Sequence, residues 1–546
     1  MNSKSAEFWN LAVSRFSIPK QNYFIIAATI VFLVAIATRF YGLSWDQGYN
    51  YTPHPDERFI LSKVTELRMP PVGDLGQLFD ADKSSWNPKR FAYGSLPLYL
   101  LKIVELGYEF TTNDRLYDLR LTGRILSSIA DVATVVFLFF VGSMAYGRRV
   151  GLMASAFAAI SVIHIQLSHF FAVDTLLTAF TIGCLFFLIR FARQGRAWDS
   201  ISAGAFLGLG LATKVSVAPI LGVFFLAHAM FVFSLLGPDQ RSFNTRLTKG
   251  LIGVGAGLAT TILVLFIAQP YMFLDWGSFY QDVSEQSEMV RRIRDYPYTR
   301  QYIDTIPYWY QVKQLSTWGL GWPLGVISWF GLIAISTRGM RFGPGATYLI
   351  SGWLIPALLL LYSNSLIITV VALLIALASL TASLFVRRLD TRTDVLLLAW
   401  VVPYFLIIGS FEVKFMRYLL PITPFLILFG AQSTLSLWAN MARQHPVLKG
   451  SVVLLFVAGI GTTLFYSLAF TSMYGEKHTA VKASEWIRAN VPADTSILKE
   501  HWEEALPNLH AYELDELEIY NPDNPQKISY AILFLFYVLI FHPFFQ

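Results

Sequence analysis

The chain has 546 residues, of which 55% are apolar and only 14% are charged, and its formal net charge is +6. A soluble protein of this length carries far more charge, so the composition excludes a soluble globular protein and indicates one that lies mostly within a membrane. The single cysteine, Cys184, excludes a disulfide framework, and the lack of a Walker motif excludes a pump with its own ATP motor.

Apolar runs long enough to cross a membrane recur along the whole chain. A helix needs roughly 17–25 apolar residues to cross ~30 Å of hydrocarbon. We therefore predict an all-α polytopic membrane protein with about thirteen transmembrane helices. They lie near residues 23–43, 126–146, 150–168, 171–189, 199–213, 215–236, 250–270, 319–337, 345–362, 365–386, 393–411, 416–438 and 451–470. The division between 199–213 and 215–236 is the least defined.

The basic residues predict the orientation of these helices. With the N-terminus in the cytoplasm, every second loop is short and basic, as the positive-inside rule requires. These loops contain Arg148 and Arg149; Arg190, Arg193 and Arg196; Arg241, Arg246 and Lys249; Arg338 and Arg341; Arg387, Arg388 and Arg392; and Arg443 and Lys449. The same bias accounts for the positive net charge, so no nucleic-acid partner is needed. We expect the first span to be an uncleaved anchor in the cell membrane.

This orientation places three larger segments on the outer face, at residues 44–125, 271–317 and 471–546. The first is predicted to contain two surface helices, one over Arg58–Arg68 and one from Tyr93 through Val104. If the second were a full span, every later loop would be inverted and the arginines would lie outside. The middle segment is charged and aromatic, so we expect it to cap a cavity or lie on the surface.

The predicted domains are therefore a membrane domain over residues 1–470 and a small extracytoplasmic α/β domain over residues 471–546. The latter opens with an amphipathic helix at Ala483–Ile487 and continues into a strand at Ser496–Leu498. Residues 528–546 lack acids, lysine and arginine, but Pro543 and the short apolar core leave a further span open.

His54-Pro55-Asp56-Glu57, in the first outer segment, is the most informative motif. Two adjacent carboxylates at a membrane surface are costly unless they bind or react with something. The alternative is that both acids only cap the surface helix that follows them.

Further charged residues fall at the outer ends of predicted spans. Asp174 is either functional or a helix N-cap. Arg124 shares a helical face with Arg120, and the two either bind phosphate or reach out to headgroups. The remaining candidates are Arg58, Lys214 and the pair Arg417-Tyr418. For this last pair, an interfacial anchor is the alternative. Acids that accept protons beside cations that hold phosphate are what transfer from a lipid phosphate needs.

The chain resembles GT-C glycosyltransferases that use polyprenyl phosphate, the group with protein O-mannosyltransferases and aminoarabinose transferases. The resemblance covers most of the chain and rests on motifs that occur in the family's order. They are Asp56-Glu57, Gly94-Ser95-Leu96-Pro97-Leu98-Tyr99, Asp174 with Leu177, Lys214 after Gly210-Leu211-Ala212-Thr213, Arg417 to Pro421, and Ser484 with Trp486-Ile487.

The resemblance implies an inverting transfer from a polyprenyl-phosphate-linked sugar to a hydroxyl of a lipid, glycan or protein on the outer face. Asp56 would be the general base, helped by Glu57. Arg58, Arg124, Asp174, Lys214, Arg417 and Tyr418 would bind the substrate and its phosphate. The related aminoarabinose transferases have a second acid where this chain reads Ala92-Tyr93-Gly94-Ser95. A site for Mg²⁺ or Mn²⁺ would therefore depend on His54, Glu57 and Asp174.

Two other classes of function remain open. A flippase or transporter of lipid-linked glycans would also be multi-pass, but transporters are often built from internal repeats, and the sequence has none. The other class is an envelope assembly protein whose catalytic site is inactive. Sugar transfer by the purified protein in detergent separates an enzyme from both.

Overall fold

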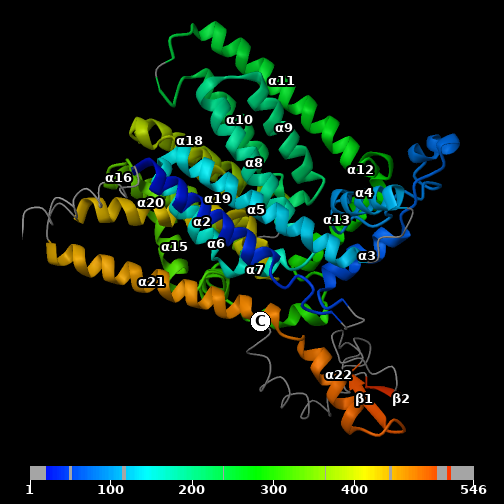
Figure 1. The fold of residues 1–546 in the computed structure, drawn as a ribbon. Helices are drawn as coiled ribbons and strands as arrows, with labels where there is room; N and C mark the ends of the chain where they lie inside the picture. The colour runs from blue at the N-terminus through cyan, green and yellow to red at the C-terminus, as the bar shows by residue number, and fades with distance from the viewer. Residues whose placement is uncertain are drawn as a thin grey trace, which may run out of the picture. The chain divides into compact units, whose positions relative to one another are not determined.

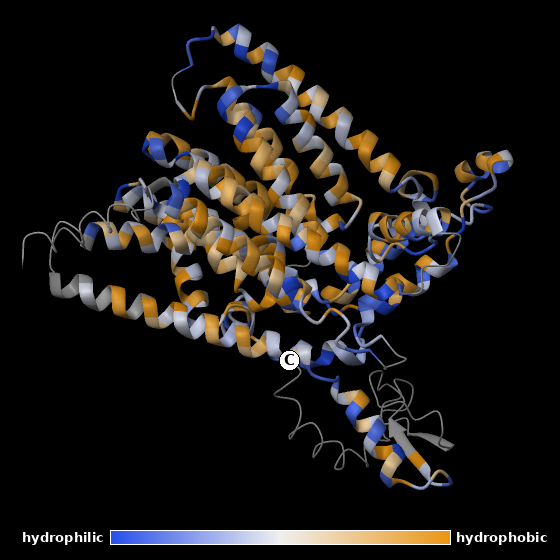
Figure 2. Cartoon of the chain, viewed as in Figure 1, coloured by the Kyte–Doolittle hydropathy of each residue, from blue (hydrophilic) through white to orange (hydrophobic). Residues whose placement is uncertain are grey.

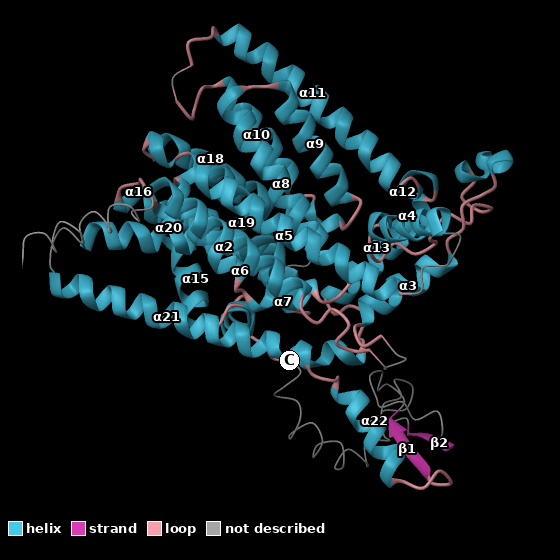
Figure 3. Ribbon diagram, in the orientation of Figure 1, coloured by secondary structure: helices cyan, strands magenta, loops and turns pink. Residues whose placement is uncertain are grey.

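The computed structural model describes residues 20–47, 52–112, 118–237, 239–362, 365–441, 446–500 and 513–517. The chain divides into two compact units, one of residues 1–43 and 59–471 and the other of residues 44–58 and 472–546. Almost all described elements are helices, and two short strands complete them (Figure 3).

A helix forms at each of the thirteen predicted membrane segments (Figure 1). These helices are α2 (Lys20–Phe40), α5 (Leu119–Tyr146), the pair α6 (Arg148–Ala159) and α7 (Val162–Ser168), α8 (Val173–Gln194), α9 (Ala197–Leu211), α10 (Ile220–Val232), α11 (Phe243–Ala268), α15 (Trp322–Thr337), the run α16–η5–α17 (Phe342–Tyr362), α18 (Leu366–Val386), α19 (Thr393–Ser410), α20 (Thr423–Met441) and α21 (Pro446–Ser472).

Nine helical runs among the described residues are long and apolar enough to cross a membrane, and the bent pair α6–α7 would be a tenth. α9 and α15 have only 15 and 16 residues. The structure thus describes a multi-pass membrane protein but does not confirm the count of thirteen. Figure 2 shows that apolar residues dominate these helices.

Local sequence explains where several helices begin and how closely they pack. The side chain of Asp118 caps α5 by accepting from the Leu121 backbone N–H. α9 and α11 approach so closely that a Cβ on Gly204 would lie 2.1 Å from the Gly257 carbonyl oxygen. Small residues at helix contacts are typical of membrane bundles, where apolar surface gains little by leaving lipid.

A buried ion cluster stabilises the break between α6 and α7, where the axis bends by 58°. Arg39 of α2 donates to the carbonyl oxygens of Ala158 and Ala159 at the end of α6. Asp131 of α5 accepts from Arg39 at 2.9 Å and lies 2.6 Å from Nδ1 of His164 in α7. The cluster therefore supplies hydrogen-bond donors to both carbonyls at the helix break, of which that of Ala158 also accepts from the Ser161 N–H at 3.2 Å.

We keep the names first and middle outer segment for residues 44–125 and 271–317 after their predicted position. The first contains α3 (Pro55–Glu66), η1 (Val72–Phe79) and α4 (Ser95–Thr112). Both predicted surface helices thus occur, and the second extends further than predicted. The middle outer segment contains α12 (Tyr271–Leu274), α13 (Trp276–Val290), η3 (Pro297–Tyr302), α14 (Trp309–Gln314) and η4 (Leu315–Gly319). Asn87 bonds Asp275 at 2.8 Å and Arg90 pairs with Asp282 at 3.2 Å, so the two outer segments contact each other.

The short elements η2 (Val215–Val217), η6 (Leu389–Thr391) and η7 (Met416–Ile422) connect spans. In the second unit, η8 (Met473–Gly475) and α22 (Thr479–Asn490) precede β1 (Ser496–Glu500). β1 pairs in parallel with β2 (Glu513–Leu517), with Ser496 opposite Glu513. The predicted helix and strand are present, whereas a complete α/β domain stays a prediction. Residues 528–546, for which a further span was left open, lie outside the described residues.

Candidate functional site

Asp174 lies in the first turn of α8, directly after the turn that follows α7. The positive end of a helix favours a carboxylate at this position. Its side chain is 1% exposed, and Oδ1 lies 3.0 Å from Nζ of Lys214. Oδ2 lies 3.9 Å from Nε of Arg417. Asp174 is thus a buried carboxylate with two cationic neighbours.

Lys214 lies where the predicted spans 199–213 and 215–236 divide. Its backbone is extended, between the end of α9 and η2, and its Nζ lies 4.6 Å from the centre of the Tyr418 ring. The backbone N–H of Gly94 donates to the Thr213 carbonyl at 2.9 Å, so the glycine of the predicted motif contacts this segment. A Cβ at Gly94 would lie 1.9 Å from the Ala212 carbonyl oxygen, so only glycine fits there.

Arg417 and Tyr418 begin η7, between α19 and α20. The guanidinium carbon of Arg417 lies 4.5 Å from the centre of the Phe415 ring and 5.8 Å from that of Tyr418. The hydroxyl of Tyr404 in α19 donates to the Tyr418 carbonyl at 3.0 Å, which fixes the start of η7. Three segments that are distant in sequence therefore meet, and we call Asp174, Lys214, Arg417 and Tyr418 the cation corner.

The charges of the cation corner suit an anionic ligand. The side chains of Lys214 and Arg417 are 19% and 20% exposed, whereas Asp174 is closed to solvent. Two cations face one carboxylate, so the corner carries a net positive charge with its cations accessible. Cations of this kind, held in place by fixed neighbours, can stabilise charge that develops on a phosphate.

Two further predicted cations donate to backbone carbonyls. Arg124, in α5, is 1% exposed, and its Nη1 donates to the Leu43 carbonyl at 2.9 Å. Arg58, in α3, is partly exposed and donates to the Thr52 carbonyl at 3.3 Å. Both have structural bonds, and their roles in binding phosphate stay predictions.

Asp56 and Glu57 occupy the first turn of α3, one residue after Pro55. Proline suits that position and the acids suit the positive helix end, as the sequence predicted. Both are buried, with Asp56 6% and Glu57 0% exposed, while His54 is partly exposed. Burial of two carboxylates in a surface helix exceeds what simple capping requires.

No group of three or more His, Cys, Asp and Glu side chains in the described part of the chain is arranged to hold a metal ion. The predicted metal site at His54, Glu57 and Asp174 is therefore not confirmed. In the cation corner, the immediate neighbours of Asp174 are Lys214 and Arg417, and cations in those positions oppose a bound divalent ion.

Aromatic residues around the cation corner escaped the sequence analysis. Phe415 contacts Tyr418, with ring centres 5.5 Å apart, and Tyr302 of the middle outer segment, with ring centres 5.4 Å apart. Phe415 precedes Arg417 by two residues, which is a weak signal. Tyr302 lies far away in a segment rich in tyrosine, so the sequence gives no sign of its contact.

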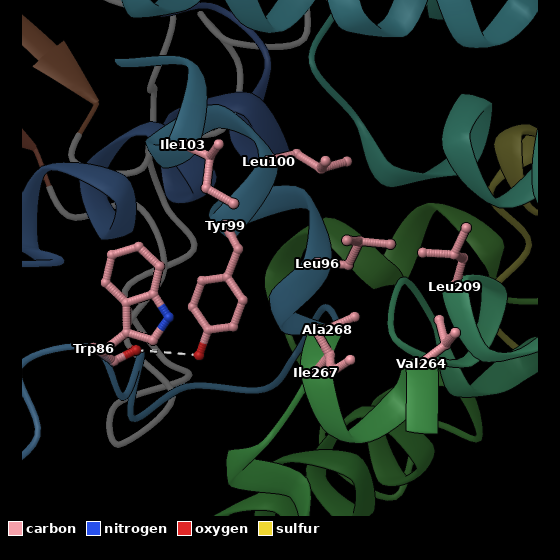
Figure 4. Close-up of a pocket in the computed structure, with 9 residues that line it drawn as sticks. All are labelled: Trp86, Leu96, Tyr99, Leu100, Ile103, Leu209, Val264, Ile267 and Ala268. Atoms are coloured by element: carbon pink, nitrogen blue, oxygen red, sulfur yellow. Dashed lines mark hydrogen bonds between the residues drawn. The ribbon is translucent and has the colours of Figure 1, made fainter. Parts of the chain in front are cut away.

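Two apolar grooves are lined by residues that flank Lys214 in the sequence. Leu209, just before it, lines a groove of about 250 Å³ with residues of α4 and α11. Figure 4 shows this groove, with Trp86 and Tyr99 at one side and the Tyr99 hydroxyl bonded to the Trp86 carbonyl. Pro219, just after it, lines a second groove of about 240 Å³ with residues of α18 and α19.

Residues 118–267 match the model of a family described as dolichyl-phosphate-mannose-protein mannosyltransferase. This match includes Asp174 and Lys214 and confirms the predicted resemblance to GT-C glycosyltransferases over that part of the chain. A comparison with curated proteins gives no match.

Several solved structures are similar at low identity. The oligosaccharyltransferase of Archaeoglobus fulgidus is 13% identical, with a TM-score of 0.47, and the match covers 87% of this chain and 59% of that one. This chain thus matches less than two thirds of the archaeal enzyme. ArnT from Cupriavidus metallidurans, bound to undecaprenyl phosphate, is 11% identical, with a TM-score of 0.44 and coverage of 90% and 85%. The protein O-mannosyltransferase complex of S. cerevisiae, bound to the sugar donor, is 11% identical, with a TM-score of 0.36 and coverage of 50% and 36%.

Proposed function

We propose that this protein is an integral membrane glycosyltransferase that moves a sugar from a polyprenyl-phosphate carrier to an acceptor hydroxyl on the outer face of the membrane. The observation that carries the proposal is the cation corner, where Lys214 and Arg417 meet beside Asp174. The family match over residues 118–267 supports it, because the family is described by a lipid-phosphate-linked sugar. Lipid, glycan and protein remain the acceptor classes.

Lys214 and Arg417 bind the phosphate of the donor in this proposal. Asp174 does not contact the phosphate, because two anions repel each other; it orients the Lys214 ammonium at 3.0 Å. When the bond between the sugar and the phosphate breaks, negative charge grows on the departing phosphate. Two prearranged cations stabilise that charge more in the transition state than in the bound donor.

Asp56 is the general base of the proposed reaction. It accepts the proton of the acceptor hydroxyl while that oxygen forms its bond to the anomeric carbon and polyprenyl phosphate departs. Attack opposite the leaving phosphate inverts the anomeric centre. The assignment rests on the Asp56-Glu57 motif and on the buried position of both acids in the first turn of α3. No step of the proposed reaction depends on a divalent ion, since the described residues include no set of ligands for it.

The groove lined by Pro219, Gly222 and residues of α18 and α19 is proposed to take part of the prenyl chain. Its lining is apolar, as a hydrocarbon chain requires, and it begins five residues after Lys214. A lipid with its phosphate at Lys214 and its chain along this groove would place the anionic head against a cation and the hydrocarbon chain against apolar side chains.

The test measures donor binding and sugar transfer by the purified full chain in detergent. Lys214→Ala and Arg417→Ala should each weaken binding of undecaprenyl phosphate by about tenfold or more, as expected for loss of a charge-assisted contact to phosphate. Arg300→Ala is the matched control, because Arg300 is an outer arginine that pairs with Asp295 at 2.6 Å outside the cation corner. Unchanged affinity in both test variants would remove the proposed phosphate site. Donor binding without any sugar transfer to lipid, glycan or protein acceptors would contradict the proposed enzyme.

A further inference from the structure

The cations of the corner lie against a continuous row of aromatic rings. Tyr302, Phe415 and Tyr418, which we call the aromatic row, make successive edge-to-face contacts with ring centres 5.4 and 5.5 Å apart. Arg417 lies over Phe415 at 4.5 Å and Lys214 lies over Tyr418 at 4.6 Å. The positions of both cations therefore depend on where these rings are held.

Tyr302 is the member of the row that belongs to a different segment. It ends η3 in the middle outer segment and is 5% exposed, and its ring also contacts Tyr310 with centres 5.7 Å apart. Phe415 and Tyr418 are each partly exposed; Phe415 ends the short connection between α19 and η7, and Tyr418 lies in η7. The buried ring of Tyr302 is thus the fixed end of the row.

Hydrogen bonds from the middle outer segment to backbone carbonyls also hold the end of α19, which precedes the connection to Arg417. Tyr308 donates its N–H to the Gly409 carbonyl at 3.0 Å and its hydroxyl to the Leu406 carbonyl at 3.0 Å. Gln311 donates to the Ile408 carbonyl at 3.1 Å. These carbonyls belong to the last five residues of α19, where the helix begins to run out of its own N–H donors.

These bonds fix where α19 ends, and the contact of Tyr302 with Phe415 fixes how the chain continues. The N–H of Val413 donates to the Val290 carbonyl at 3.0 Å, so the connection is held at both ends. An arginine on a flexible connection would lose conformational freedom on binding phosphate. One that is already held loses less and binds more tightly.

We propose that Tyr302 is a positioning residue for the phosphate-binding cations. Its ring fixes Phe415, and Phe415 and Tyr418 in turn hold Arg417 and Lys214 toward the donor phosphate. The inference rests on the proposed function, since it assigns Tyr302 a part in the same phosphate site. Tyr302 acts through its ring, and its hydroxyl has no part in the proposal.

The experiment compares ring-removing and ring-keeping variants of the full chain in detergent. Tyr302→Leu should weaken binding of undecaprenyl phosphate by about threefold to tenfold, the usual worth of an aromatic contact of this kind. Tyr302→Phe keeps the ring and should bind as the unchanged protein does. Tyr298→Leu is the matched control, since Tyr298 is a 53% exposed tyrosine of the same 3-10 helix.

Two further measurements separate positioning from general loss of structure. Binding of undecaprenol, the same chain without phosphate, should be equal in Tyr302→Leu and Tyr302→Phe. With Arg417→Ala already present, Tyr302→Leu should cause a clearly smaller loss of phosphate binding than it does alone. If Tyr302→Leu does not fold, Phe415→Leu removes the next ring of the row and carries the same expectation.

The outcomes distinguish this inference from the proposed function. If Lys214→Ala and Arg417→Ala weaken phosphate binding but Tyr302→Leu does not, the positioning role is wrong and the phosphate site stands. If neither cation variant affects binding, the phosphate site itself is wrong. An equal loss for Tyr302→Leu and Tyr302→Phe would assign the effect to the hydroxyl and overturn the role of the ring.

Discussion

Lys214 lies between the carboxylate of Asp174 and the ring of Tyr418. A cation over an aromatic face gains about 0.5–2 kcal/mol, with the larger values where water is excluded. The carboxylate and the ring together fix the ammonium. A fixed and partly exposed ammonium suits a phosphate oxygen, as the role proposed for Lys214 requires.

Asp56→Asn tests the proposed base, because the amide keeps the size of the side chain and cannot accept a proton. Product formation should fall at least ~10²-fold, the usual lower contribution of a positioned base. Binding of undecaprenyl phosphate and extraction of the intact protein should be unchanged. Near-normal turnover, measured by mass spectrometry of the glycosylated product, would move the base to Glu57 or Asp174.

We expect the protein to lose stability in mild acid because of His169, which lies in the turn between α7 and α8. Burial lowers the pKa of its imidazole below the ordinary value of 6.5. Its bonds to the Tyr41 and Ile165 carbonyls raise that pKa, and nearby Arg124 and Arg39 lower it. The net shift is downward, so between the folded pKa and 6.5 the unfolded chain binds more protons. Stability therefore decreases as pH falls below about 6.5, the ordinary pKa of histidine.

The measurement is thermal unfolding in detergent at about pH 7.5 and about pH 5.5. Histidine in the unfolded chain takes up its proton between these values. The melting temperature of the unchanged protein should fall more between these values than that of His169→Gln, whose side chain does not titrate. Equal changes in the two proteins would show that another group governs the response to acid.

The helices are held together by polar contacts as well as by apolar packing. At the break between α6 and α7, Arg39 donates to the carbonyls of both Ala158 and Ala159. The N-terminus of α8, with Asp174, follows this break after the seven residues of α7 and a short turn. The ion cluster of Arg39, Asp131 and His164 thus supports the element that places the carboxylate of the cation corner.

Asp131→Asn should destabilise the protein strongly, by about 3–5 kcal/mol, because it leaves Arg39 as an uncompensated buried charge. The combined variant Arg39→Met with Asp131→Leu removes both charges and should regain part of this loss. Thermal unfolding of the three proteins in one detergent is the measurement. A single variant as stable as the unchanged protein would contradict the structural role of the ion pair.

At the scale of the whole molecule, the orientation in the membrane decides which loops can meet an extracytoplasmic substrate. α4 illustrates how charge limits the number of spans. This 18-residue helix contains Lys102 and Glu105, which pair at 2.8 Å, and it is absent from the runs that qualify as spans. The alternation of basic loops predicts that the cation corner and the middle outer segment lie outside.

Cysteine labelling tests this orientation with little background, because the native Cys184 is 0% exposed. Trp198→Cys, beside Arg196, and Phe342→Cys, beside Arg341, should react with a membrane-impermeant maleimide only after cells are opened. Gln301→Cys should react in intact cells. These changes retain the arginines that set the orientation, and labelling of Phe342→Cys in intact cells would invert the later spans and displace the proposed site.

The sequence alone determined the class of protein and the approximate position of its helices. Apolar run length is a local property that the membrane thickness translates directly into spans, so every predicted segment is a helix in the structure. The Pro55-Asp56-Glu57 turn was likewise predictable, since helix capping depends only on neighbouring residues. The family resemblance also followed from short motifs in order.

Only the tertiary structure decided which charged residues share a site. Asp174, Lys214 and Arg417 were each candidates for their own local reasons, and their meeting depends on how α8, η2 and η7 pack. Packing also showed Arg124 bonded to a backbone carbonyl and brought Tyr302 against Phe415. Such contacts join residues far apart in the chain, where no local pattern records the partner, because charge and ring type do not encode distance.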